Sequence, residues 1–255
     1  MERDPALNTV GVVKKFGGLI ALRGVNVSVS PNTVTMLIGP NGSGKTTLIN
    51  VISGIYKPDE GRVILRGEDI TGLPPHKIYS LGLVRTFQIP SPFLKLTVLE
   101  NLMVAAKGQI GEGLLAAVIK RKSWMRQEEA LEEKAFKVME LLSLDKLWDR
   151  RASELSGGQT KLLEIGRALM SDPSIILMDE PIAGVNPRLA HDIMEYIVNI
   201  RKEVGLSFLI VEHRLDIVLD YVDYVYAMHE GEVISKGAPE EVVSDPIVVK
   251  SYLGG

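Results

Sequence analysis

The chain has 255 residues, enough for one α/β domain with an insertion, and its 45% hydrophobic and 24% charged residues are ordinary globular values. A formal net charge of −3 gives no electrostatic reason to expect a nucleic acid partner. With no cysteine, the chain forms neither a disulfide framework nor a thiolate metal site, which fits a reducing compartment. The start MERDPALNTV lacks a signal-peptide core, and no run approaches the roughly 18 apolar residues of a membrane span, so a soluble cytosolic chain is expected.

The first part of the chain alternates short β-prone pieces with turn residues. The pieces NTVGVV, VNVSVS and VTMLI are separated by FGG and SPNT, which predicts antiparallel strands leading into a buried strand at residues 34–38. A further strand is predicted at RVILRG, residues 62–67.

A glycine-rich turn, GPNGSGKTT, follows the VTMLI strand and precedes a helical segment, and it fits the phosphate-loop pattern G-x-x-x-x-G-K-[ST]. Glycines allow backbone N–H groups to turn toward phosphate oxygens, and the helix start adds partial positive charge. Lys45 would reach the β- and γ-phosphates, and the Thr46 hydroxyl would ligate Mg²⁺. An ordinary turn with a solvated lysine is the alternative, and the full match in a strand, loop and helix context favours nucleotide binding. The predicted phosphate-binding residues are Gly39, Pro40, Asn41, Gly42, Ser43, Gly44, Lys45, Thr46 and Thr47.

The pattern becomes helical between about Thr97 and Leu144, where Leu131, Ala135, Val138 and further apolar residues recur at steps of three or four. This block predicts a helical insertion. It is followed by LSGGQ at residues 155–159, where Ser156 can cap a helix that continues through QTKLLEIGRALM. Glycines after the cap leave backbone N–H groups bare, so the chain contains a second helix start suited to phosphate.

The last third of the chain alternates apolar β-prone runs, SIILMD, SFLIVE and VDYVYAM, with helical segments such as PRLAHDIMEYIVNIRKEV, which predicts a parallel sheet with covered faces. Two carboxylates end the first of these runs. Asp179 can hold the hydration shell of Mg²⁺, and Glu180 can accept a proton from an attacking water. A solvated turn is the alternative, but Pro181 ends the run at the sheet edge that carries the phosphate loop, which favours two catalytic roles.

The LSGGQ pentapeptide, with the Lys-Thr loop before it and LMDE after it, closely resembles the signature of ATP-binding-cassette (ABC) ATPases, and the resemblance covers essentially the whole chain. It implies an α/β P-loop NTPase cassette with a mixed sheet core, an N-terminal antiparallel β subdomain and an inserted helical subdomain. The implied organisation is a single ATPase domain, 1–255, with a nucleotide-binding core at about 1–88 and 160–255 and a helical signature subdomain at about 89–159.

The resemblance also implies ATP or ADP and Mg²⁺ as cofactors, and a head-to-tail dimer with a second ABC ATPase subunit, identical or homologous. In such a dimer the signature residues of one subunit close over the γ-phosphate held by the Lys45 loop of the other. The signature residues are Ser156, Gly157, Gly158 and Gln159.

Smaller motifs carry further roles by resemblance. Phe16 in VKKFGG matches the aromatic residue that stacks on adenine, although taken alone it would be a core residue. Gln88 in VRTFQ resembles the glutamine that touches Mg²⁺ and the attacking water, and His213 resembles the switch histidine that contacts the γ-phosphate. Outside the family context a lone histidine is about as often structural. Asn186 in AGVNP departs from the aspartate of most cassettes, which leaves the contact across the dimer at this position open.

The segment IPSPFLKLTVLENL, residues 89–102, resembles the part of importer-type cassettes that docks a cytoplasmic helix of a permease, with Phe93 and Leu94 in its loop. Buried loop anchors are the alternative reading of these apolar residues. MDEPIAGVNP, GQIGEGLLAAVIKRKSWM and the ending EGEVISKGAPEEVVSDPIVVKSYLG look most like the ATP-binding subunit of branched-chain amino acid importers. The resemblance implies separate integral-membrane permease subunits, a substrate-binding protein as an indirect partner, and a location on the inner face of the membrane.

The alternatives to this interpretation are an ABC ATPase that serves a different solute and three other classes of protein. DNA-repair cassettes separate their halves with long coiled coils, and no sustained heptad run is present. Translation-factor cassettes usually carry two nucleotide domains and a basic linker, whereas this chain has one set of motifs. A P-loop kinase or GTPase would lack LSGGQ and the glutamate that follows LMD.

Overall fold

The computed structural model describes residues 4–86, 91–108 and 121–253. The chain divides into two compact units, residues 1–88 with 174–255 and residues 89–173. The sequence-based division places the return to the first unit at about residue 160, whereas the second unit extends to Pro173. The difference is helix α6 (Gly157–Met170), which packs on helices α3 and α5 of the second unit.

An antiparallel sheet forms one layer of the first unit, with strand order β2-β1-β5-β6 and β3 paired to β1. Its strands are β1 (Leu7–Phe16), β2 (Leu19–Val25), β3 (Ser28–Val29), β5 (Glu60–Leu65) and β6 (Glu68–Asp69). The predicted antiparallel N-terminal strands are confirmed, but β2 was not predicted. The sequence predicts a break between strands at FGG. In the structure Gly17 and Gly18 form a two-residue turn that brings Leu19 opposite Phe16.

A second sheet has the strand order β11-β10-β4-β9-β8-β7 and is parallel except for the antiparallel β10–β11 pair. Its strands are β4 (Val34–Ile38), β7 (Leu83–Thr86), β8 (Ile175–Asp179), β9 (Ser207–Val211), β10 (Tyr224–His229) and β11 (Glu232–Gly237). Strands β4 and β9 are buried at every position, as expected where both faces of a parallel sheet are covered. The predicted parallel sheet is therefore confirmed.

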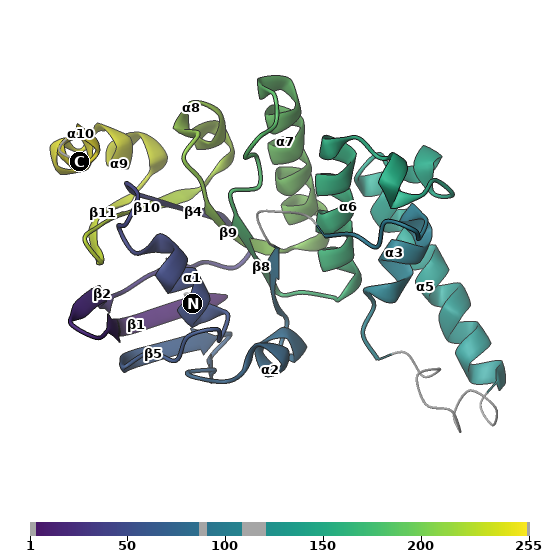
Figure 1. The fold of residues 1–255 in the computed structure, drawn as a ribbon, viewed down its shortest axis with the longest axis horizontal. Coiled ribbons are helices and arrows are strands. Elements are labelled where there is room, and N and C mark those ends of the chain that lie inside the picture. The colour runs from purple at the N-terminus through teal and green to yellow at the C-terminus, as the bar shows by residue number, and fades with distance from the viewer. Residues whose placement is uncertain (1–3, 87–90, 109–120, 254–255) are drawn as a thin grey trace. The chain divides into compact units, whose positions relative to one another are not determined.

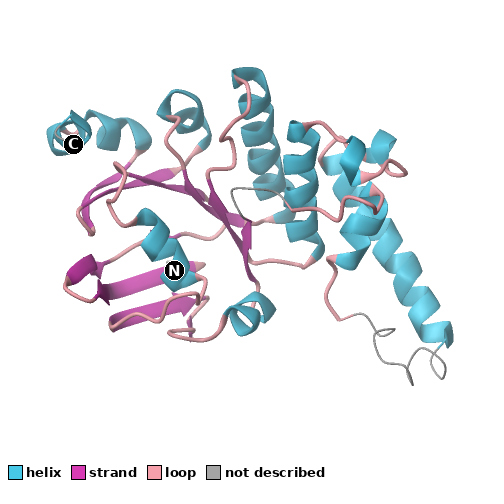
Figure 2. Cartoon of the chain, in the orientation of Figure 1, coloured by secondary structure: helices cyan, strands magenta, loops and turns pink. Residues whose placement is uncertain are grey.

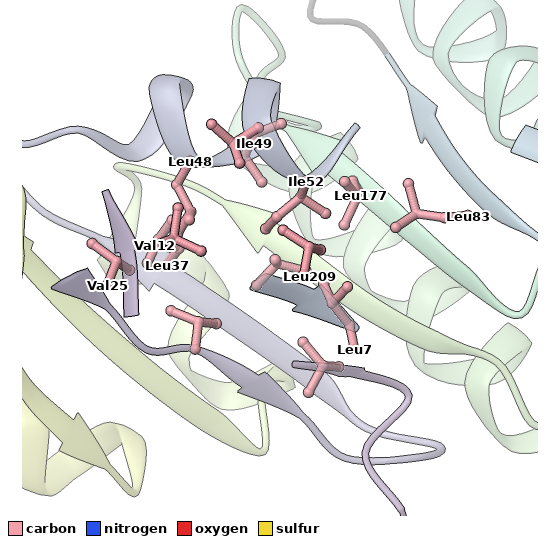
Figure 3. Packing of buried hydrophobic residues seen from close by; sticks show 14 of the residues in the cluster. Leu7, Val12, Val25, Leu37, Leu48, Ile49, Ile52, Leu83, Leu177 and Leu209 are labelled. Carbon is pink, nitrogen blue, oxygen red and sulfur yellow. The ribbon is translucent and has the colours of Figure 1, made fainter. Parts of the chain in front are cut away.

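The helices of the first unit connect these strands or, in the case of α9 and α10, follow the last strand (Figures 1 and 2). They are α1 (Lys45–Ile52), α2 (Pro75–Ser80), α7 (Pro187–Val204), α8 (Leu215–Val218) with the 3₁₀ turn at Leu219–Tyr221, α9 (Pro239–Ser244) and α10 (Pro246–Leu253). Helix α7 covers the residues predicted for it, and its apolar face is buried. Figure 3 shows Leu48, Ile49 and Ile52 of α1 gathered with side chains of the parallel sheet and with Leu7 of β1. This cluster fixes α1 against the sheet, just after the loop that connects the helix to β4.

The second unit is helical. Its elements are α3 (Val98–Val104), α5 (Arg121–Leu141), the 3₁₀ turns Asp145–Leu147 and Ala152–Glu154, and α6. Gly166 of α6 allows close packing, since a Cβ there would lie 2.8 Å from Leu102 and 3.1 Å from Leu142. The predicted helical insertion is therefore present. Among the described residues, no helix is long and apolar enough to cross a membrane.

The buried side chain of Asn101 binds several backbone groups of the loop before α3. Asn101 is 0% exposed, and its Oδ1 accepts from the backbone N–H of Phe93 at 2.8 Å. Its Nδ2 lies within hydrogen-bond distance of the carbonyl oxygens of Phe93, Leu96 and Thr97, at 2.9 to 3.2 Å. The Thr97 side chain accepts from Glu100 N in a capping box that starts α3. The loop is thus fixed from inside while Phe93 remains 49% exposed.

Replacing Asn101 by Ala is expected to destabilise the second unit, because a buried donor and several carbonyl acceptors lose their partner. The expected loss is about 1–3 kcal/mol, the usual cost of leaving such groups unsatisfied. Urea unfolding, together with hydrogen exchange of the amides at residues 91–104, measures it. Lys95→Ala, an exposed change in the same loop, serves as the control and is expected to stay within about 0.5 kcal/mol of the parent. Equal stability of the two variants would contradict the role of Asn101.

Candidate active site

The glycine loop runs from the end of β4 to the start of α1. Gly39 has φ +149°, and a Cβ at this position would lie 2.2 Å from the carbonyl oxygen of Met228. Gly44 has φ +104°, and a Cβ there would lie 2.8 Å from the carbonyl oxygen of Ala21. Both positions therefore require glycine for conformation and for space. Gly44 is the N-cap of α1 and has no side chain to cap it, so the first N–H groups of the helix are available to a ligand.

Lys45 is buried at the start of α1, with 6% of its surface exposed. Its Nζ donates to the carbonyl oxygens of Gly39 at 2.8 Å and Pro40 at 2.9 Å. Burial lowers the pKa of the Lys45 ammonium below its ordinary value, and the nearby carboxylates of Glu180 and Asp179 act in the opposite direction. The loop thus holds a cation close to two anions.

The two carboxylates follow the end of β8. The Oδ2 atom of Asp179 lies 3.0 Å from the guanidinium of Arg85, which also reaches the side chain of Asn50 in α1 at 2.6 Å. Glu180 has φ +52°, a left-handed conformation that costs a non-glycine residue of order 1–2 kcal/mol. Its Oε1 atom lies 3.2 Å from Nε2 of His213. The strained turn therefore points the second carboxylate toward the histidine that follows β9.

A third carboxylate lies behind this pair. Glu212 is 2% exposed, and its Oε1 accepts from the N–H of Ile182 at 2.9 Å while its Oε2 accepts from the N–H of His213 at 3.0 Å. The pKa of the Glu212 carboxyl lies above its ordinary value, because burial outweighs the backbone hydrogen bonds that lower it, and the charge of Glu180 also raises it.

Lys45, Asp179, Glu180 and His213 share a pocket of about 570 Å³. It is lined by Phe16, Leu19, Ile20, Ala21, Arg23, Asn41, Gly42, Gly44, Lys45, Thr46, Thr47, Asp179, Glu180, Val211, His213, Glu230 and Gly231. Phe16 is 42% exposed and meets the ring of Tyr56 edge-on, with the ring centroids 5.2 Å apart. The structure thus brings together the aromatic residue, the glycine loop, both carboxylates and His213 in one cavity. Gly39, Pro40 and Ser43 support the cavity from behind, where they contact Nζ of Lys45.

Other predicted residues lie elsewhere. Gln88 falls outside the described residues. The signature belongs to the second unit, where Ser156 is the N-cap of α6 and forms a capping box with Gln159. Gly157 is exposed and Gly158 is buried in the first turn of this helix. Asn186 caps α7, with its Oδ1 accepting from Leu189 N at 2.9 Å, so its amide oxygen serves a local structural bond.

Sequence reasoning missed three residues that support the site, namely Arg85, Tyr56 and Glu212. Arg85 stands three residues before Gln88 in the VRTFQ segment, and Glu212 directly precedes His213, so both adjoin motifs that were recognised. Tyr56 carries no pattern that connects it with Phe16. A charged residue at the end of a buried, β-prone run is the signal that could have identified Arg85 and Glu212.

The oxygen groups in the pocket fit a magnesium ion. Thr46 offers a hydroxyl and Asp179 a carboxylate, which are ligand types that Mg²⁺ prefers. The described residues contain no group of three or more His, Cys, Asp or Glu side chains that could hold a metal alone. This donor set suits Mg²⁺, which is usually held by one or two protein oxygens together with water and substrate phosphates.

A phosphate loop at the start of α1 and an acidic pair at the same sheet edge define the class: a P-loop nucleotide-binding cassette. Comparison with known proteins agrees with this class. Residues 22–183 match the family described as "ABC transporter", and residues 232–255 match "Branched-chain amino acid ATP-binding cassette transporter".

Two similar relatives are named "Probable branched-chain amino acid transport ATP-binding protein LivG". The one from Archaeoglobus fulgidus is 54% identical over 97% of this chain and 95% of its own length. The one from Methanocaldococcus jannaschii is 53% identical over 97% of each chain. A solved structure of the ADP conformation of an ATP-binding cassette from an ABC transporter is 51% identical, covers 98% of this chain and 99% of that chain, and superposes with a TM-score of 0.84.

The chain belongs to the ABC transporter family. It is an ATPase of the cassette type, in which hydrolysis of ATP is coupled to transport.

Lys45→Ala is expected to weaken ATP binding about tenfold to hundredfold, because a charge-assisted hydrogen bond to phosphate contributes about 1.5–3 kcal/mol. Turnover is expected to fall as well. Direct titration with ATP measures the affinity, and Lys77→Ala, an exposed lysine change in α2 of the same unit, is the control. An unchanged ATP affinity would exclude Lys45 as a phosphate ligand.

Proposed function

We propose that this chain is the ATP-hydrolysing subunit of an importer for branched-chain amino acids, acting with separate permease subunits and with a second cassette subunit. The observation that carries the ATPase assignment is the shared pocket of Lys45, Asp179, Glu180 and His213. The substrate class rests on the names of full-length relatives and on the match of residues 232–255 to the branched-chain amino acid group.

In this proposal ATP lies with its phosphates on the glycine loop and its adenine against Phe16. Lys45 moves from its carbonyl partners to the β- and γ-phosphate oxygens, which offer stronger, charged acceptors. Thr46 and Asp179, together with Gln88, would hold Mg²⁺, which would supply positive charge beside the phosphates. Backbone N–H groups of the glycine loop and of the first turn of α1 follow the phosphate chain.

Glu180 accepts a proton from the water that attacks the γ-phosphorus, and the bond from that phosphorus to the β–γ bridging oxygen breaks to release ADP. His213 lies 3.2 Å from the Glu180 carboxylate and is 37% exposed in its side chain, so it can reach both the carboxylate and a phosphate oxygen. His213 would contact the γ-phosphate only when ATP is bound, so this contact would distinguish bound ATP from bound ADP.

The second cassette closes the site in this proposal. Ser156 and the glycines after it would meet the γ-phosphate of the partner's nucleotide through a helix start that carries partial positive charge. Such a contact lasts only while the γ-phosphate is intact. ATP would therefore join two subunits, and hydrolysis would release them.

The loop held by Asn101 is the proposed contact with the permease. Phe93 and Leu94 are 49% and 59% exposed, and the Arg167 guanidinium lies over the Phe93 ring at 5.2 Å from its centroid. Apolar side chains exposed on a loop with fixed backbone suit a partner helix better than a core role does. The permease would place the cassette at the inner face of the membrane, with a substrate-binding protein on the opposite side as an indirect partner and no nucleic acid involved.

Glu180→Gln is expected to bind ATP with nearly unchanged affinity and to lose hydrolysis by about a hundredfold or more, because the amide cannot accept the proton. Trapped ATP should convert monomers into dimers that contain two nucleotides. Size-exclusion chromatography with ATP, with ADP and without nucleotide measures this change. Glu203→Gln, an exposed change in α7, is the control for removal of a carboxylate. Hydrolysis at the parent rate, or a variant that stays monomeric with saturating ATP, would require different roles for the carboxylates.

Phe93→Ala is expected to leave the ATPase activity of the isolated chain nearly unchanged and to lower transport by the assembled importer several-fold, since it removes a large exposed contact. Both activities are measured on the same preparation, in solution and in proteoliposomes with the permease. Val204→Ala, which shortens a side chain that is 58% exposed in the first unit, is the control. A parallel loss of both activities would indicate that Phe93 is only a structural anchor.

A further inference from the structure

The buried carboxylate of Glu212 accepts hydrogen bonds from the backbone of two loops, the loop that carries Glu180 and the loop that carries His213. Glu212 follows the last residue of β9 and does not line the nucleotide pocket. Its two oxygens are divided between two loops: Oε1 accepts from Ile182 in the loop after β8, and Oε2 accepts from His213 in the loop after β9. The same carboxylate therefore joins the segments that carry Glu180 and His213.

We propose that Glu212 is a positioning residue for ATP hydrolysis, which sets the distance between the catalytic carboxylate of Glu180 and the imidazole of His213 by fixing both loops. This inference rests on the function proposed above and adds a residue to it. Glu212 is not among the residues that line the pocket, and it acts through the backbone of its neighbours.

The loop after β8 needs such a support because its backbone is strained at Glu180. Glu180 is left-handed with φ +52°, and it is followed at once by Pro181, which has no N–H to donate. Alternate residues of the loop are bonded: the N–H of Glu180 donates to Val211 O at 2.9 Å, and the N–H of Ile182 donates to Glu212. Consecutive residues at the end of β9 thus clamp the turn that aims Glu180.

The hydrogen bonds around the Glu212 side chain fit a carboxylate and not an amide. Backbone N–H groups of Ile182 and His213 approach different oxygens of the Glu212 side chain, and a third hydrogen bond comes from the backbone of Arg214. An ionised carboxylate accepts at both oxygens, whereas a glutamine side chain presents donors at one end. In Glu212→Gln one N–H would therefore face an NH₂ group, and one of the two loops would lose its bond.

The test compares the turnover number and the ATP affinity of Glu212→Gln with those of the parent chain. We expect kcat to fall about tenfold to hundredfold, as small misplacements of catalytic groups do. The Kd for ATP and the number of binding sites should stay unchanged, because the described hydrogen bonds of Glu212 are to the loops after β8 and β9 and not to the glycine loop. Glu212→Asp, which keeps both acceptor oxygens but is shorter by one methylene group, should lose part of kcat and serves if Glu212→Gln does not fold.

Tyr226→Phe is the matched control for stability. Its hydroxyl is buried in the same unit, accepts from Ser28 N at 3.0 Å and donates to Ser28 O at 3.2 Å, and it lies outside the pocket lining. All rates are measured well below the Tm of each variant. A parent-like kcat in Glu212→Gln and Glu212→Asp, a loss of ATP sites in proportion to kcat, or an equal loss of kcat in Tyr226→Phe would overturn the inference.

Glu180→Gln in the same assay separates this inference from the proposed function. If Glu180→Gln hydrolyses ATP at the parent rate, the proposed function fails in its choice of base, and the role of Glu212 fails with it. If Glu180→Gln stops hydrolysis while Glu212→Gln keeps the parent kcat, only the positioning role is wrong.

Discussion

The site depends on the level register of three adjacent parallel strands. Leu37 of β4 pairs with Val211 of β9, and Val211 pairs with Asp179 of β8, so the three strands end within one residue of each other. The glycine loop follows β4, the two carboxylates lie at the end of β8, and His213 follows β9. A slip of one residue would turn every side chain of a strand to the opposite face. The apolar residues that fix this register in the core therefore fix the chemistry as well.

The charged side chains at the carboxyl ends of these strands are paired with other groups of the protein. A buried ammonium group is costly unless it is paired, and Lys45 has carbonyl partners on its own loop and two carboxylates nearby. Arg85 lies against Asp179 and ties it to α1 through Asn50. Protein groups thus hold the Asp179 carboxylate in position, and in the proposed function Lys45 only exchanges its carbonyl acceptors for phosphate oxygens. Such preorganisation reduces the cost of ordering these side chains when phosphate arrives.

Local patterns in the sequence predicted the elements that local physics determines. The phosphate loop, the strand ending at Asp179 and the helix that begins at Pro187 were found because motif spacing and hydrophobic period lie within a few residues. Arg85 and Glu212 were not found, since their partners stand 94 and 30 residues away and meet them only in the folded sheet. The reason for glycine at position 39 is likewise distant, because the atom it avoids belongs to Met228.

The signature helix contains an apparent conflict between a structural bond and a proposed ligand. Ser156 already accepts the N–H of Gln159 at 3.3 Å, and the Gln159 side chain accepts the N–H of Ser156 at 2.9 Å. A serine hydroxyl has two acceptor sites and one proton, and the capping bond uses only an acceptor site. The hydroxyl proton can therefore be donated to a γ-phosphate oxygen without breaking the cap. Because the capping box fixes the rotamer of Ser156 in advance, the same bond that starts α6 would prepare the donor for the phosphate contact across the dimer that the proposed function assigns to Ser156.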